Sequence, residues 1–249
     1  MAAQPPWRVV WITGASTGIG FEVARQLAAR GVIVAASARR ESPDFGSANV
    51  HYFKLDVTDA AAVAAISRLI EEQLGPIDLC LFAAGRYKAS APGHFDLVAE
   101  TAMNQANYVA VLNCIAATLP TLIARKTGHI AWIASVAGYG GLPRSAGYGP
   151  TKAALINLAE SLHLELAGTG VAVSVINPGF VKTPMTDQND FPMPFMITAE
   201  DAAQRTIAGL EAGRFEIAYP RRFVYILKFL GLLPYWLYFR IVGMATRGM

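Results

Sequence analysis

The segment Arg8–Gly20 reads RVVWITGASTGIG and places a buried strand, a glycine turn and the start of a helix in direct succession. The run Arg8–Thr13 is apolar and rich in β-branched residues, which is typical of a strand covered on both faces. Apolar residues from Ile19 to Arg30 recur at helical spacing, and Gly31 closes that helix. The segment therefore predicts a strand–turn–helix unit.

The glycines of this turn predict a dinucleotide site. Gly14 allows the tight turn, Gly18 lets the backbone approach a pyrophosphate, and Gly20 lets helix and strand pack closely. Backbone N–H groups around Ser16, Thr17 and Ile19 and the positive end of the helix would then bind the phosphates. Glycines that only form a turn are the alternative, and the strand before them and the helix after them argue against it.

The rest of the chain alternates strands with helices. We predict further strands at Val32–Ser37, Val50–Leu55, Asp78–Phe82, Gly128–Ala134, Val171–Ile176 and Phe215–Tyr219. We predict further helices at Asp59–Leu74 (with Thr58 as N-cap), Thr101–Arg125, Tyr148–Leu166 and Thr198–Ala212. This order indicates an α/β class, a doubly wound parallel sheet or Rossmann fold. We expect one domain over residues 1–219, with an apolar helical appendage at residues 220–249.

Composition excludes several classes of protein. Of the 249 residues, 53% are hydrophobic and 16% are charged, which excludes an intrinsically disordered chain. Cys80 and Cys114 lie in apolar runs, so buried thiols are favoured over a disulfide or redox pair. Met1–Pro6 lacks the pattern of a secretion signal, so we expect a cytoplasmic protein. No metal site is expected, because the histidines lack ligand spacing: His51, His94, His129 and His163.

Charge is distributed unevenly. The net charge is +3, and no acidic residue follows Glu216. The basic residues beyond it are Arg221, Arg222, Lys228, Arg240 and Arg247. Because this basic excess lies in an apolar tail, it argues against nucleic acid and for a membrane surface or an anionic lipid.

The end of the second predicted strand bears on the choice of nucleotide. It reads Ser37-Ala38-Arg39-Arg40 and has no carboxylate to accept a ribose 2′-OH. A guanidinium suits a 2′-phosphate by charge and by bidentate geometry, so we expect NADP(H) rather than NAD(H). The alternative is that Arg39 and Arg40 are solvated surface arginines.

Three residues further along predict proton-transfer chemistry. Tyr148 and Lys152 are four residues apart at the start of a predicted helix, so they share a face. Ser135 follows a strand at the carboxyl edge, where doubly wound sheets bind ligands. We expect the Lys152 ammonium to lower the pKa of Tyr148. Tyr148 would then exchange a proton with a carbonyl or alcohol oxygen to which Ser135 hydrogen-bonds.

The glycine run, Ser135 and the Tyr148-x-x-x-Lys152 pair together resemble the short-chain dehydrogenase/reductase family, in its compact branch, over Val9 to Tyr219. The resemblance implies that Tyr148 is the general acid in reduction and the base in oxidation. It implies that Lys152 holds the nicotinamide ribose and that Ser135 orients the substrate carbonyl. Asn107 matches the asparagine that binds a water in the proton relay.

The resemblance also implies further cofactor contacts. Asp56 and Val57 match the pair at the adenine, and the backbone of Ala84 and Gly85 would contact the cofactor. Along the nicotinamide, the matching residues are Pro178, Gly179, Val181 and Thr183. One position departs from the family, because Ala83 stands where an asparagine braces the sheet.

The same resemblance implies a homodimer or homotetramer formed through the helices Thr101–Arg125 and Tyr148–Leu166. It implies an oxidoreductase that acts on CH–OH or C=O groups. The alternative is an NADP-binding regulatory or scaffold protein without turnover. Loss of the tyrosine or the lysine would mark such a protein, and both are present here.

Two apolar segments bear on the substrate. The stretch from about residue 184 to 197 is irregular and rich in Pro, Met and Phe, and we expect it to form a lid over an apolar pocket. Residues 221–249 predict two short helices joined at Leu233-Pro234, because a span needs about 20 apolar residues. This tail packs either on the lid or a partner subunit, or on a membrane surface. Either arrangement favours an apolar, lipid-like small-molecule substrate.

Overall fold

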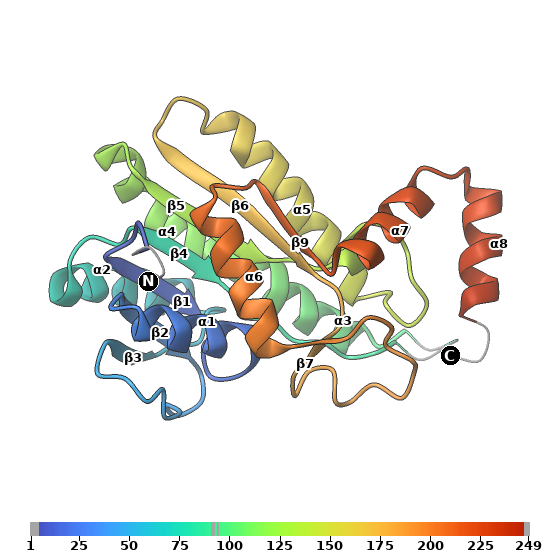
Figure 1. Ribbon diagram of the computed structural model, residues 1–249, viewed down its shortest axis with the longest axis horizontal. Coiled ribbons are helices and arrows are strands. Elements are labelled where there is room, and N and C mark those ends of the chain that lie inside the picture. The colour runs from blue at the N-terminus through green and yellow to red at the C-terminus, as the bar shows by residue number, and fades with distance from the viewer. Residues whose placement is uncertain (1–4, 91–92, 94, 247–249) are drawn as a thin grey trace.

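The computed structural model describes residues 5–90, 93 and 95–246, and it contains a seven-stranded parallel sheet (Figure 1). His94 and Arg247 lie outside the described residues. The sheet has the order β3-β2-β1-β4-β5-β6-β9. Its strands are β1 (Val9–Thr13), β2 (Ile33–Ala38), β3 (Val50–Lys54), β4 (Leu79–Phe82), β5 (Gly128–Ile133), β6 (Val171–Pro178) and β9 (Glu216–Tyr219). The predicted strands and the doubly wound parallel sheet are confirmed.

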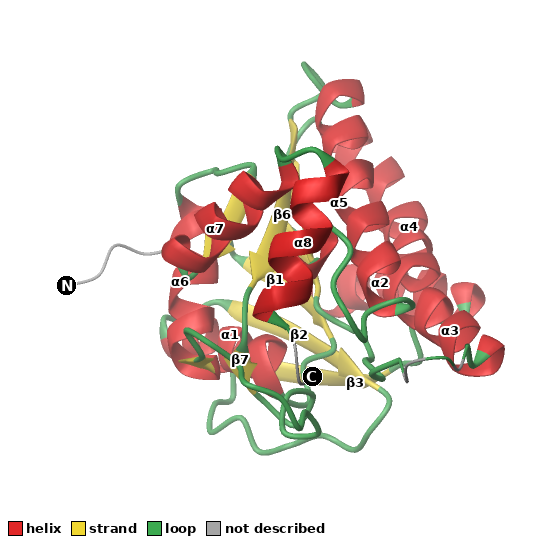
Figure 2. Cartoon of the chain, turned by 90° about the vertical axis from the view of Figure 1, so that its right-hand side faces the viewer, coloured by secondary structure: helices red, strands yellow, loops and turns green. Residues whose placement is uncertain are grey.

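Helices cover both faces of this sheet, so its central strands β1 and β4 are buried along their length (Figure 2). One face packs against α2 (Ala60–Leu74), α4 (Ala110–Arg125) and α5 (Tyr148–Glu165). The other packs against α1 (Gly18–Ala29) and α6 (Ala199–Glu211). After β3 the chain crosses to β4 on the other side of β1, so the strand order reverses between β1 and β4. Sheets of this kind bind ligands at the carboxyl ends of the strands on either side of such a reversal.

The long central helix differs from the uninterrupted one that the sequence predicted. It begins with α3 (Leu97–Asn104), passes through a π-helical turn, η1 (Gln105–Val109), and continues as α4. Apolar periodicity did not reveal this turn, because the turn shifts the helix by one residue without ending it. The predicted N-cap Thr58 is also wrong: Asp59 caps α2 by accepting from the Ala62 N–H at 3.0 Å.

Leu97–Arg125 is the one helical stretch among the described residues that is long and apolar enough to cross a membrane, by length and composition alone. Its buried residues include Cys114 and Leu122, which belong to the core beneath the sheet. Cys80 on β4 lies in the same core, and both cysteines are buried free thiols. We therefore assign this stretch to the interior of the α/β domain.

The segment after β6 is irregular, as expected of a lid. It contains the two-residue strands β7 (Val181–Lys182) and β8 (Ile197–Thr198), which pair with each other and were not predicted. Beyond β9 lie α7 (Arg221–Gly231) and α8 (Tyr235–Ala245), the two short helices that the tail sequence predicted. They project beyond the sheet at the right of Figure 1.

A buried histidine makes the stability of the fold sensitive to acid. His129 on β5 is 6% exposed, and its Nε2 lies 2.8 Å from Ser174 Oγ. Ser174 donates its own proton to Arg214 O, so Nε2 of the neutral imidazole is the donor in the pair. Burial lowers the pKa of His129 to about 4.

We expect His129 to cost stability as the pH falls. The unfolded chain takes up a proton below about pH 6.5, whereas the folded imidazole stays neutral until about pH 4, so stability is lost across that window. In urea unfolding, the wild type should lose about 2 kcal/mol more between pH 7.5 and pH 5 than His129→Gln does. The exposed His51 supplies the matched control, His51→Gln. Equal losses in wild type and His129→Gln would contradict this assignment.

Candidate active site

A cleft of about 280 Å³ opens at the carboxyl edge of the sheet. Every residue that the sequence assigned to cofactor binding lines it: Gly14, Ser16, Thr17, Gly18, Ile19, Gly20, Arg39, Arg40, Asp56, Val57, Ala84, Gly85, Tyr148, Lys152, Pro178, Gly179, Val181 and Thr183. Ser135 also lies in this wall, whereas Asn107 is buried behind it. One cavity thus unites segments that are far apart in the sequence.

The glycine turn has a backbone that side chains would obstruct. Gly14 has φ +69°, and a Cβ built there would lie 2.5 Å from Ala84 N. A Cβ on Gly20 would lie 2.6 Å from Gly14 O, and one on Gly18 would lie 3.1 Å from Thr183 Cγ2. The turn leads into the N-terminus of α1, so its N–H groups can bind anionic phosphates. The residues present therefore fit a dinucleotide.

The two arginines predicted to select NADP lie in the cleft wall. The Arg39 guanidinium is 4.0 Å from the Asp56 carboxylate, and both side chains are largely exposed. Asp56 accepts hydrogen bonds from the Thr58 N–H and hydroxyl, and the first of these is the main cause of its lowered pKa. Arg39 is thus held near the cleft by a weak contact that a stronger anionic ligand can replace.

Ser135, Tyr148 and Lys152 meet where the cleft reaches the ends of β5 and β6. The single proton of the Ser135 hydroxyl is shared between two acceptors, Pro178 O at 3.4 Å and the Tyr148 oxygen, and only one of them can receive it at a time. Lys152 Nζ donates to Ile133 O at 2.8 Å and lies 5.4 Å from the centre of the Tyr148 ring. The three residues that the sequence predicted as a group are therefore neighbours.

The pKa of Tyr148 contradicts the expectation from sequence. Burial raises the pKa of Tyr148 to about 12, against the lowering effect of its hydrogen bond from Ser135. Burial also lowers the pKa of Lys152 to about 7. The prediction that Lys152 would lower the pKa of Tyr148 is wrong for this structure, because loss of hydration outweighs an ammonium that is directed at a carbonyl.

Asn107 is held by the π-helical turn, fully buried behind the cleft. Its Oδ1 accepts from the Arg86 N–H at 2.8 Å, and its Nδ2 donates to Arg86 O and to Thr151 Oγ1. Both amide hydrogens are therefore donated to protein atoms. A relay water would have to bind another atom of this residue, its Oδ1 or its backbone carbonyl.

Sequence reasoning missed Thr151, which connects Asn107 to the helix that carries the tyrosine and lysine. Thr151 is buried, accepts from Asn107 at 3.1 Å and donates to Tyr148 O at 2.8 Å. It lies one residue before Lys152, so the motif itself contained it. Its role was hidden because its partner is on a helix that lies 44 residues earlier in the chain.

The departure at Ala83 has a structural counterpart. Thr13 Oγ1, at the end of β1, is buried without a hydrogen-bond partner among the described residues. The Thr13 backbone carbonyl still accepts from the Ala83 N–H at 3.1 Å. The sheet is thus joined here by a backbone hydrogen bond alone. The sequence predicted this, because Ala83 replaces an asparagine whose side chain would add a further hydrogen bond.

A second cavity of about 330 Å³ lies beyond Tyr148. Its wall is mostly apolar and comes from the lid and the tail, with Phe191 from the lid and Leu227 and Leu230 from α7. Tyr87 lines it as well and meets the Tyr148 ring edge-on at 5.1 Å between centroids. The predicted lid therefore does bound an apolar pocket.

The tail packs on this lid. The Phe223 ring of α7 lies 5.7 Å from that of Phe180 and 6.0 Å from that of Phe195. On α8, the Tyr238 hydroxyl donates to Gly141 O at 2.8 Å. Of the alternatives for the tail, packing on the lid is seen for α7 through Phe195, whereas α8 contacts the loop after β5 at Gly141.

Comparison with known proteins identifies relatives over most of the chain. The family model for short chain dehydrogenases matches residues 8–192. An uncharacterized oxidoreductase of Myxococcus xanthus is 33% identical over 240 residues, which covers 93% of this chain and 95% of that protein.

Solved structures with a bound nucleotide are similar in fold. A short chain dehydrogenase from Burkholderia cenocepacia in complex with NADP superposes with a TM-score of 0.82 at 27% identity, covering 93% of this chain and 96% of that one. A variant of actinorhodin polyketide ketoreductase with NADPH has a TM-score of 0.76 at 25% identity, covering 88% and 97% of the two chains. Sequence and fold thus agree on the relatives.

Proposed function

The chain belongs to the short-chain dehydrogenase/reductase family and is an NAD(P)-dependent oxidoreductase, and we propose that it uses NADP(H) to interconvert a carbonyl and an alcohol on an apolar, lipid-like substrate. The observation that carries this proposal is that Ser135 and Tyr148 line both the nucleotide cleft and the apolar cavity. A ligand in each space would meet at these two hydroxyls. The relatives bound to NADP and NADPH support the choice of nucleotide.

The residues at this junction have distinct roles in the proposal. A nicotinamide bound in the cleft would supply or accept the hydride. Tyr148 would donate its phenolic proton to the carbonyl oxygen, and the Ser135 hydroxyl would hydrogen-bond the same oxygen. Lys152 would hold the cofactor ribose and replenish the proton by way of Asn107 and water.

The raised pKa of Tyr148 bears on its protonation state. Because burial raises this pKa to about 12, the phenol carries its proton at neutral pH, as a general acid in carbonyl reduction must.

The proposed function is tested by NADPH consumption, followed with ketones and aldehydes that range from short water-soluble chains to long apolar ones. We expect turnover to rise with apolar length until the cavity is filled. Absence of turnover across the whole series, with NADPH bound, would refute the reaction and leave the alternative of a nucleotide-binding protein without turnover.

Preference for NADP depends on the exposed arginines of the cleft wall. Arg39→Ala removes a guanidinium that is placed to hydrogen-bond a 2′-phosphate, and we expect the KM for NADPH to rise about 10- to 100-fold. The KM for NADH should stay within about threefold, because NADH has no 2′-phosphate. Arg68→Ala, at an exposed position of α2, is the matched control. A similar rise in KM for both nucleotides would contradict the assignment.

Assembly and location belong to the same proposal. We propose a cytoplasmic homodimer or homotetramer that forms through the outer faces of α4 and α5. These faces expose apolar residues, among them Ile123 and Leu164. Contact between two flat helical faces of this kind is common in symmetric oligomers.

A further inference from the structure

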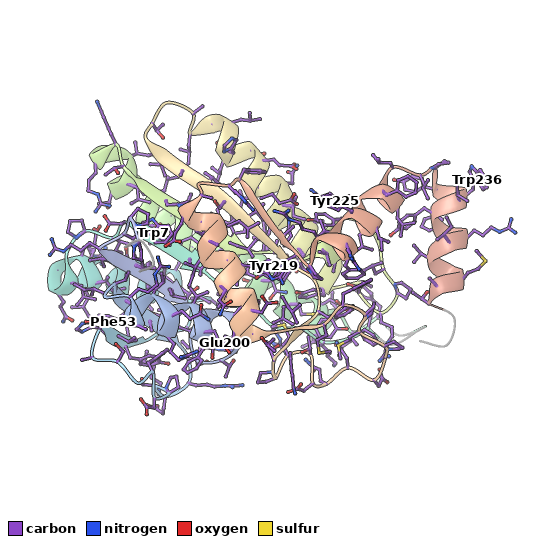
Figure 3. The ribbon with its side chains drawn as sticks, in the orientation of Figure 1. Trp7, Phe53, Glu200, Tyr219, Tyr225 and Trp236 are labelled. Atoms are coloured by element: carbon purple, nitrogen blue, oxygen red, sulfur yellow. The ribbon has the colours of Figure 1, made fainter. Side chains whose placement is uncertain are left out.

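The outer faces of α7 and α8 expose large hydrophobic side chains at one end of the molecule. Tyr225 on α7 is 66% exposed and Trp236 on α8 is 68% exposed, and Trp236 lies at the end of the molecule farthest from the sheet in Figure 3. The other exposed members of this surface are Phe229, Leu232, Tyr235 and Phe239. Exposed apolar residues gathered in this number on two neighbouring helices mark a binding site more often than they are left to solvent.

Cations lie on the same faces as these aromatic rings. Arg221 precedes Tyr225 by four residues on α7, and Trp236 precedes Arg240 by four residues on α8, so each pair shares a face. Arg221, Arg222 and Arg240 are all exposed. No acidic residue follows Glu216 in the sequence, and Glu216 is paired with Lys228. The outer surface therefore combines aromatic rings with uncompensated positive charge.

The inner faces of the same helices form part of the wall of the substrate cavity. Leu227 and Leu230 of α7 and Ile241 and Val242 of α8 line it. Ile226 lines the cavity and is also 48% exposed. The two helices that carry the outer aromatic rings therefore also form part of the cavity wall.

We propose that the α7–α8 hairpin docks on an anionic phospholipid bilayer and that its apolar substrate enters the cavity from that bilayer. Aromatic rings flanked by arginines suit the interface, because the rings occupy the headgroup level while the guanidinium groups reach the phosphates. Each basic residue close to an anionic surface strengthens binding about fivefold, so the three exposed arginines together contribute roughly a hundredfold.

Charge argues against a second copy of this chain as the occupant. Two hairpins in a symmetric contact would bring Arg221, Arg222 and Arg240 of both copies together, and neither hairpin carries a carboxylate. Like charges that face each other across an interface oppose association. A bilayer that contains phosphatidylserine supplies the missing negative charge.

Vesicle binding tests the docking surface independently of any turnover. The sequence has four tryptophans, of which Trp7, Trp11 and Trp132 are buried and Trp236 is exposed, so a change in fluorescence on binding reports on α8. With phosphatidylcholine vesicles that contain phosphatidylserine, we expect a blue shift of the emission. We expect binding roughly a hundredfold tighter than to phosphatidylcholine alone, with the difference lost at high salt.

Variants separate the parts of the surface. Trp236→Ser together with Phe229→Ser should abolish sedimentation with vesicles, and Arg221→Gln with Arg222→Gln should reduce it most for anionic vesicles. The controls are Val98→Ser, an exposed hydrophobic residue on α3, and Arg68→Gln on α2. Unchanged NADPH binding and thermal midpoint would show that each variant is folded.

Two results would overturn docking. The first is wild-type protein that does not bind anionic vesicles. The second is hairpin variants that bind them as well as the controls do. Sedimentation velocity supplies a further check: a dimer that Trp236→Ser dissociates, in protein that ignores vesicles, would assign this surface to a second copy instead.

Entry from the bilayer rests on the proposed function and is tested by turnover. Anionic vesicles should raise the turnover of a long-chain ketone dissolved in the bilayer at least about tenfold, and should leave that of a short water-soluble ketone unchanged. Vesicle binding without this stimulation would overturn entry from the bilayer. Failure of both ketones would refute the proposed reaction while the binding result still stands.

Discussion

Tyr148→Phe lowers kcat for carbonyl reduction about a thousandfold and leaves NADPH affinity within about twofold; this is the expected result if the phenol is the proton donor, since a positioned acid contributes about 10²- to 10⁴-fold. The change removes one oxygen and keeps the ring that packs against Tyr87 at 5.1 Å. The loss should therefore appear in turnover and not in folding. Stopped-flow measurement of NADPH oxidation and fluorescence titration of NADPH give the two quantities.

The control for this variant removes a phenol that lies outside both cavities. Tyr108→Phe does so on the π-helical turn next to Asn107 and should retain the wild-type kcat. A second comparison is Ser135→Ala, which leaves the acid in place and should cost less than Tyr148→Phe. If Tyr148→Phe kept more than about a tenth of the wild-type kcat, a different group would have to supply the proton.

Gly14→Ala is the second change with a large expected effect. The added Cβ would lie 2.5 Å from Ala84 N and 2.6 Å from Ala83 C, at φ +69°. Backbone strain in the left-handed region and overlap with a neighbouring strand end each cost about 1–3 kcal/mol. We expect the free energy of unfolding to fall by about 3 kcal/mol or more, and NADPH binding to weaken with it as the turn moves.

Gly46→Ala separates the two causes. Gly46 has φ +65°, nearly that of Gly14, but a Cβ there would meet nothing within 4 Å. It should therefore cost only the conformational strain, about 1 kcal/mol, and should leave NADPH binding unchanged. Urea unfolding and NADPH titration of both variants provide the test. Equal destabilisation would mean that the close approach to Ala84 is tolerated.

The sheet could be predicted because its strands are continuous apolar runs separated by glycine turns, and the cleft because its residues follow strand ends in order. The two-residue strands at Val181 and Ile197 could not be predicted, because so short a pair has no period. The pKa of Tyr148 was predicted to be lowered, and in the structure burial raises it. Spacing places a cation near a phenol but does not reveal how far both are buried.

The sequence of the tail also predicted its helices without revealing how far their side chains are buried. Its composition predicted two helices and left open whether they pack on the protein or on a membrane. In the structure the inner face of α7 packs on the lid and the outer faces of both helices stay exposed, so packing on the protein is seen while contact with a membrane stays a prediction. Helical periodicity could not settle this, because the apolar residues of α7 and α8 occupy buried and exposed positions alike, as Val224 and Phe229 do.

The π-helical turn η1 constrains the number of residues that the central helix can contain. A π turn contains one residue more than an α-helix needs, so deletion of any residue from Gln105 to Val109 would restore regular geometry. Because the wide turn absorbs that residue locally, the segments on either side would keep their faces, and Ala99 and Met103 would stay in the core. Asn107, which the wide turn places beside Thr151, would lose that position. Surface loops generally tolerate changes in length, whereas removal of this turn would break the hydrogen bonds by which Asn107 joins Arg86 to Thr151.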